Sequence, residues 1–169
     1  MHRLLFLALV GALVSGRAPA AEPHVPWALS DSSRWFALRL RPGQDLLGEL
    51  RRFARERGLR AAFVASCAGS ARRSSVRYSN QPQASVREGH FEIVSLSGTI
   101  TAAGAHLHVG LADSTGQAFG GHLMEGTTIY TTAEIVLGEL GGVDFVREPD
   151  RTYGYQELAP RARHGTRAP

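Results

Sequence analysis

Residues 104–123 read Gly-Ala-His-Leu-His-Val-Gly-Leu-Ala-Asp-Ser-Thr-Gly-Gln-Ala-Phe-Gly-Gly-His-Leu. On both sides of a short polar segment, apolar side chains alternate with histidine or small residues. This pattern is typical of two antiparallel strands joined by a hairpin loop. A three-residue loop from Ser114 to Gly116 puts glycine at the position that needs a left-handed backbone. The stretch therefore predicts a hairpin with strands over residues 105–112 and 117–123.

The register of this hairpin brings three histidines together. The loop pairs Asp113 with Gln117, and counting back along both strands sets His108 opposite His122. His106 lies two residues before His108, so it faces the same side at ~6.6–6.8 Å along the strand. The neighbouring residues on this face are glycine and alanine, too small to cover the imidazoles. The opposite face is apolar: Leu107, Val109, Leu111, Phe119 and Leu123.

Three neutral imidazoles with an open fourth position make the catalytic type of zinc site. We therefore predict that His106, His108 and His122 bind a metal ion, with zinc as the first choice, although imidazole also suits copper, iron and nickel. Such an ion can lower the pKa of a bound water or polarise a carbonyl group. In the alternative interpretation, the histidines make ordinary hydrogen bonds within the sheet or at a subunit interface.

Two acids are candidates for acid–base catalysis beside this site. Glu92 shares a strand face with apolar residues, where a salt bridge to an arginine is the alternative. Glu125 follows His122 closely, and a solvated acid in a turn is the alternative there. Tyr153 and Tyr155 are interpreted as packing residues. The sequence contains no phosphate-binding loop, no dinucleotide-binding glycine pattern and no nucleophile elbow. The sequence therefore leaves open whether the protein is an enzyme and what its substrate is.

The rest of the chain predicts an α+β domain, mainly antiparallel β-sheet with one principal flanking helix. Residues 35–40 form a strand candidate, and residues 45–57 have helical periodicity that ends at Gly58. Gly69-Ser70 is expected to bend the chain between two strands that pair with each other, 59–68 and 74–79. The remaining strand candidates are residues 91–100 and 127–137, with a short one at Phe145-Val146.

The length of 169 residues is enough for one domain. We expect this domain over residues 35–158, between an N-terminal arm at 21–34 and a disordered tail at 159–169. The net charge of +4 over a whole domain does not indicate a nucleic-acid groove. The one cysteine, Cys67, excludes an intramolecular disulfide and lies in an apolar run, which favours a buried structural thiol over a nucleophile.

Residues 1–20 have the three regions of a secretory signal peptide. A basic start at Arg3 precedes an apolar run, and Ala18-Pro19-Ala20 gives a small-residue cleavage pattern. The run is well short of the ~20 residues that span a bilayer as a helix. We therefore expect a secreted or extracytoplasmic protein without a membrane span. A mitochondrial transit peptide is the alternative, because the segment contains arginine and no acid.

An ordered set of short motifs resembles the PPC domain family, also called the DUF296 or PD1-like domain. The motifs extend over about residues 36–158. They are Leu38-Arg-Leu-Arg-Pro-Gly-Gln-Asp-Leu46, Cys67-Ala-Gly-Ser70, Gly89-His-Phe-Glu-Ile-Val-Ser-Leu-Ser-Gly-Thr-Ile100, His106-Leu-His-Val109, Gly120-Gly-His-Leu-Met-Glu-Gly126, Thr132-Ala-Glu134 and Thr152-Tyr-Gly-Tyr-Gln-Glu-Leu158.

This resemblance implies an antiparallel sheet flanked by a helix and a homotrimeric assembly. In stand-alone prokaryotic members it also implies a histidine-bound metal, which maps onto His106, His108 and His122. Plant members carry an AT-hook, Arg-Gly-Arg-Pro, which is absent from this sequence. We therefore expect a metal-binding protein that binds or turns over a small polar molecule. The alternatives are a homotrimeric interaction module without catalysis and, less favoured, a DNA-associated protein.

Overall fold

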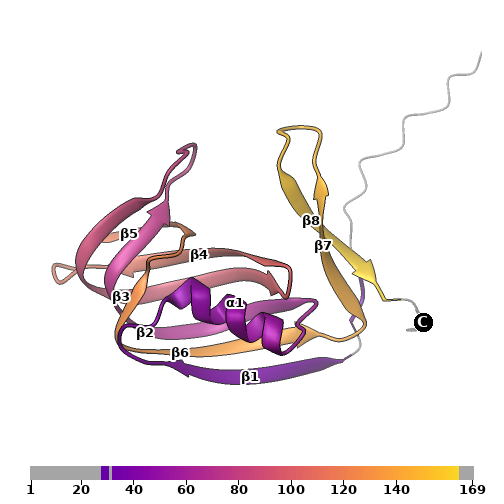
Figure 1. Cartoon of the computed structure of the whole chain (residues 1–169), viewed down its shortest axis with the longest axis horizontal. Coiled ribbons are helices and arrows are strands. Elements are labelled where there is room, and N and C mark those ends of the chain that lie inside the picture. The colour runs from indigo at the N-terminus through magenta and orange to yellow at the C-terminus, as the bar shows by residue number, and fades with distance from the viewer. Residues whose placement is uncertain (1–27, 31, 164–169) are drawn as a thin grey trace, which may run out of the picture.

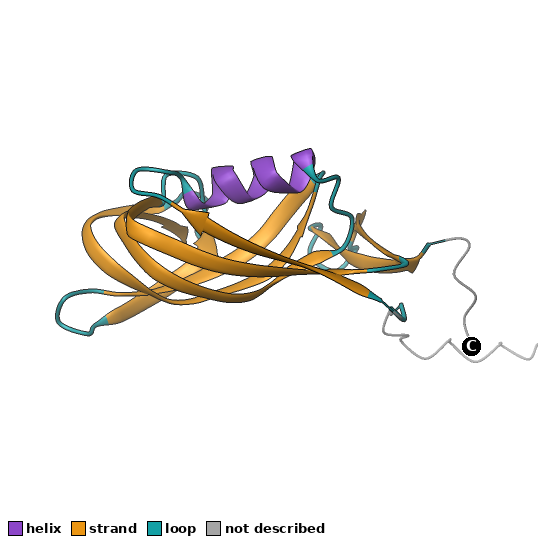
Figure 2. Ribbon diagram, turned by 90° about the horizontal axis from the view of Figure 1, so that it is seen from below, coloured by secondary structure: helices purple, strands orange, loops and turns teal. Residues whose placement is uncertain are grey.

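In the computed structural model, which describes residues 28–30 and 32–163, one helix lies across one face of a curved six-stranded sheet (Figures 1 and 2). All strand pairs are antiparallel, in the order β1-β6-β2-β3-β4-β5. This confirms the predicted α+β class. The strands are β1 Ser33–Leu40, β2 Ala62–Arg77, β3 Ser85–Thr101, β4 Gly104–Ala112, β5 Ala118–Leu123 and β6 Thr128–Leu140.

The sheet closes on itself at one end, because β5 pairs with the end of β2 as well as with β4. Val76 is the register partner of Leu123, and Arg77 is the partner of His122. Strands β2 to β5 therefore surround one end of the core, and the last residue of β2 lies beside the predicted metal site.

The helix α1 spans Leu46–Glu56 and confirms the predicted helical segment. Asp45 caps its N-terminus by accepting a hydrogen bond from the Gly48 amide at 2.7 Å. Gly58 follows the helix with a φ of 60°, as expected for a left-handed C-terminal glycine. The apolar face of the helix packs against the sheet through Leu46, Leu47, Leu50 and Ala54.

The hairpin of β4 and β5 has the predicted register, with His108 opposite His122. Gly116 has a φ of 82°, and its amide donates to the Asp113 carbonyl at 2.9 Å. The predicted apolar face packs into the core, where Phe119 is partly buried and the other members are fully buried: Leu107, Val109, Leu111 and Leu123.

The predicted bend at Gly69-Ser70 is wrong, because β2 is one continuous strand of 16 residues. Register shifts on both sides of Gly69, against β6, curve the strand without ending it. Gly69 is needed for close packing, since a Cβ there would lie 2.1 Å from the Thr132 carbonyl oxygen. The two halves of β2 therefore do not pair with each other; both pair with β3 and β6.

A second hairpin stands beyond the sheet, formed by β7 Val143–Pro149 and β8 Gln156–Ala162 (Figure 1). The sequence predicted only the Phe145-Val146 part of it. The Phe145 amide donates to the Arg60 carbonyl at 2.9 Å and fixes the base of the hairpin to the start of β2. Strand β8 includes residues 159–162, so the predicted disordered tail is wrong for these residues.

The predicted leader at residues 1–20 lies outside the described residues, as does the end of the predicted tail from residue 164. Within the described part of the chain, no helix has the length and apolar character required to span a bilayer.

Candidate metal centre

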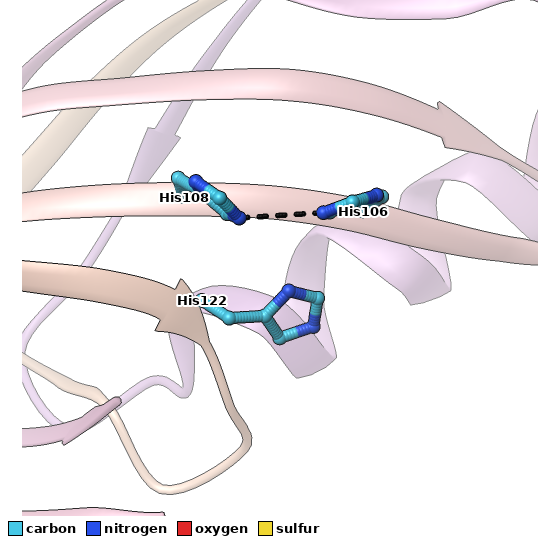
Figure 3. A group of neighbouring side chains, drawn as sticks. All are labelled: His106, His108 and His122. Carbon is cyan, nitrogen blue, oxygen red and sulfur yellow. Dashed lines mark hydrogen bonds between the residues drawn. The ribbon is translucent and has the colours of Figure 1, made fainter. Parts of the chain in front are cut away.

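The three predicted histidines converge on one face of the β4–β5 hairpin (Figure 3). His106 and His108 extend from β4, and His122 extends from β5. The ring centroids are 5.2 Å apart for His106 and His108, 5.0 Å for His106 and His122, and 5.6 Å for His108 and His122. The alternation of side chains along each strand and the register of the hairpin together produce this cluster.

The ring nitrogens are spaced closely enough to share one ion. One nitrogen of each histidine lies within 4.8 Å of those of the other two. The Nε2 atoms of His106 and His108 are 3.3 Å apart. Two nitrogens at ~2.05 Å from a tetrahedral zinc ion are ~3.3 Å apart, so this pair already has the spacing of two zinc ligands.

The electrostatic environment keeps two of the imidazoles neutral. Partial burial, followed by the charge of Arg147, lowers the pKa of His106 below its usual value. Burial, followed by repulsion from Arg77 and from His106 when that ring is protonated, lowers the pKa of His122 to about 4. A neutral imidazole has the free lone pair that a metal requires, so both rings are in the ligand form at neutral pH.

The histidines lie in the floor of a pocket of about 1020 Å³. Gly120 and Gly121 form part of this floor, and a Cβ at Gly120 would lie 2.4 Å from the Val109 carbonyl oxygen. One wall is the segment from Arg77 to Pro82, and the opposite wall is the β7–β8 hairpin. Because the imidazoles face this open volume, an ion bound by them would have room for a further ligand.

The β7–β8 hairpin contributes residues that the sequence did not predict for the site. Arg147, Tyr153, Tyr155 and Glu157 all line the pocket. Tyr153 is 82% exposed and Tyr155 is 68% exposed, so their interpretation as packing residues is wrong. The family motif at residues 152–158 marked this segment, but the sequence alone gave no reason to place it opposite the histidines.

The two predicted acids lie apart from the three histidines. Glu92 is exposed, and its register partner is Ala112, four residues beyond His108 and ~13 Å away along the strand. The Glu125 carboxylate accepts a hydrogen bond from Arg51 of α1 at 2.8 Å. Among the described residues, neither glutamate belongs to the ligand cluster or lines the pocket. A catalytic role for either stays a prediction.

Comparison with proteins of known structure supports the fold. A protein from Salmonella cholerae-suis is 41% identical, with a TM-score of 0.78, over 80% of this chain and 98% of that one. A metal-containing protein from Archaeoglobus fulgidus is 28% identical, with a TM-score of 0.65, over 80% of this chain and 98% of that one.

A curated relative is much longer than this chain. The bifunctional protein GlmU of Synechococcus sp. (strain JA-3-3Ab) is 44% identical over 144 residues, which cover 85% of this chain. The match spans only 23% of the length of that protein. The model of the Plants and Prokaryotes Conserved (PCC) domain matches residues 29–141, most of the described chain. This chain therefore belongs to the Plants and Prokaryotes Conserved domain family, the family that its motifs resemble.

Proposed function

We propose that this protein binds a divalent metal ion, with zinc as the first choice, through His106, His108 and His122. The observation that carries the proposal is the convergence of three ring nitrogens within 4.8 Å of one another in the floor of a pocket. The description of the relative from Archaeoglobus fulgidus as metal-containing supports it. An open coordination position would face the pocket, where a small polar molecule binds.

The chain supplies the groups that would organise this chemistry. A bound ion would act as a Lewis acid or lower the pKa of a water molecule. The three histidines would hold the ion on the paired strands β4 and β5, and residues of the β7–β8 hairpin line the same pocket. This arrangement suits a metal-dependent binding protein or enzyme, and a metal-loaded sample is the proper starting point for a substrate search.

Elemental analysis of the untagged protein tests the metal site. We expect close to one metal ion per chain in the wild type and almost none in a His108→Ala variant. His90→Ala is the matched control, because His90 stacks on Tyr130 at 4.1 Å and is not part of the cluster. A folded wild-type protein that binds no metal after incubation with zinc would overturn the proposal.

We also propose, from the family resemblance, that three copies of the chain assemble as a homotrimer. The sheet face opposite α1 is uncovered within the described chain (Figure 2). It has exposed apolar residues that another copy could bury, among them Trp35 and Val94, each 59% exposed.

We further propose that the protein is secreted or extracytoplasmic, because residues 1–20 have the three regions of a signal peptide. N-terminal sequencing of the mature protein would test this proposal.

A further inference from the structure

Two arginines flank the histidine cluster from opposite sides. Arg77 is the last residue of β2 and the register partner of His122. Side chains of register partners in antiparallel strands lie on the same face, with Cβ atoms ~4.5–5.5 Å apart. The side chain of Arg77 therefore begins on the β5 side of the cluster, and its Nη1 donates a hydrogen bond to the Gln81 carbonyl at 3.5 Å. Arg77 and Gln81 both line the pocket.

Arg147 approaches from the other side, on β7 of the second hairpin. Its Nη2 donates a hydrogen bond to the Thr99 hydroxyl at 3.1 Å. Thr99 is the register partner of His106, so this bond holds the guanidinium beside the first histidine of the cluster. Arg147 lines the same pocket as Arg77.

The positive charge of these two arginines is only partly balanced. Within the described part of the chain, neither forms a salt bridge with a carboxylate. Glu157 is the one acid that lines the pocket among the described residues, and its charge acts on His106. Two guanidinium groups and a divalent ion together exceed this single negative charge, so the pocket would attract anions.

We propose that the pocket binds a small anion bearing carboxylate or phosphate groups, held between Arg77 and Arg147 with one oxygen directed at the metal ion. This inference rests on the proposed metal site and names the class of molecule that the site accepts. Guanidinium groups match carboxylate and phosphate oxygens with paired hydrogen bonds, which makes them selective for such ligands. The pocket volume of about 1020 Å³ has room for a small molecule of this kind.

Calorimetric titration of the zinc-loaded protein with malonate tests the inference, with malonamide as an uncharged probe of similar size. We expect malonate to bind and malonamide not to bind. Arg77→Gln and Arg147→Gln should each weaken malonate binding by about tenfold or more, because each removes a charged hydrogen-bond donor. Arg151→Gln is the matched control: it removes the same charge from the exposed turn of the hairpin, outside the pocket lining, and should leave the affinity unchanged.

Arg77→Lys and Arg147→Lys keep the positive charge and should bind malonate more tightly than the glutamine variants. This comparison separates the loss of a charge from the loss of the fold. Equal affinity in the wild type and both glutamine variants, or equal binding of malonate and malonamide, would overturn the inference. Metal content is measured on the same samples. If the wild type contains one metal ion per chain but its affinity for malonate does not depend on the arginines, only the anion site is overturned. A wild-type protein that contains no metal overturns the proposed function. In that case, arginine-dependent malonate binding by the metal-free protein would still support the arginine pair.

Discussion

Burial controls the reactivity of Cys67, the one cysteine of the chain. Desolvation raises the pKa of this half-buried thiol to about 11. At pH 8 only about one thiol in a thousand would then be the reactive thiolate, against roughly a quarter for an unperturbed cysteine. The structure therefore agrees with the interpretation of Cys67 as a structural thiol.

We expect iodoacetamide to alkylate native Cys67 at pH 8 at least about tenfold more slowly than the same residue in urea. The expected ratio of the two alkylation rates is smaller than the ratio of the two thiolate populations, because a more basic thiolate is intrinsically more nucleophilic. Mass spectrometry of timed samples measures both rates. Equal rates in the native and unfolded protein would show that the fold does not protect this thiol.

The individual residues of the site differ in how far the sequence could predict them. His106, His108 and His122 belong to one hairpin, so the position of Gly116 and strand alternation were sufficient to place them on one face. Arg77 and Arg147 reach the same place through long-range contacts, the β2–β5 pairing and the bond to Thr99. Local periodicity contains no information about such contacts, which is why the sequence did not predict these arginines as site residues.

At the scale of elements, the position of β4 depends on Gly98 of β3. This glycine has a φ of 126°, and a Cβ there would lie 2.1 Å from the His106 carbonyl oxygen. The absence of a side chain at this position therefore lets β3 approach β4 closely beside the first predicted metal ligand. Gly104, at the start of β4, has open space around its missing Cβ.

We expect Gly98→Ala to lower the free energy of unfolding by about 2 kcal/mol or more, because it adds both backbone strain and a steric clash. It should also weaken metal binding by displacing His106. Gly104→Ala should change the stability by less than about 0.5 kcal/mol. Urea denaturation of the metal-free variants measures the stabilities, and a zinc titration measures the affinities. Equal stability of the two variants would contradict the proposed role of Gly98.

Among the elements, α1 and the β4–β5 hairpin were predictable because local signals define them. Asp45 and Gly58 mark the ends of the helix, and its apolar residues repeat at helical spacing. The continuity of β2 was not predictable, because Gly69-Ser70 has the composition of a turn, and long-range pairing with β3 and β6 keeps it in a strand. Of the β7–β8 hairpin, only the short strand at Phe145-Val146 was predicted, since the side chains of the hairpin are mostly exposed and lack apolar alternation.

At the scale of the whole molecule, the pocket combines three parts of the chain that are far apart in sequence. The end of β2, the β4–β5 hairpin and the β7–β8 hairpin each contribute lining residues. The second hairpin rises from the sheet rather than packing flat on it (Figure 1). The shape of the pocket therefore depends on how this hairpin is held, through contacts such as that between Arg147 and Thr99.

The uncovered face of the sheet allows the proposed homotrimer to be tested at this scale. Trp35 of β1 packs edge-to-face on Phe63, with ring centroids 5.9 Å apart, and is 59% exposed. Aromatic residues are enriched in the cores of protein–protein interfaces, so Trp35 is a suitable place to test for a contact on this face. If copies of the chain associate through this face, a charge placed there would have to be buried in the interface.

We expect light scattering coupled to size-exclusion chromatography to give three times the mass of one chain for the wild type. Trp35→Asp should shift the protein toward the monomer at micromolar concentration, because an unpaired carboxylate opposes association. Tyr153→Asp is the matched control, since it removes an exposed aromatic residue from the second hairpin instead of the sheet face. A trimer that persists in Trp35→Asp would place the interface elsewhere, and a monomeric wild type would overturn the proposed assembly.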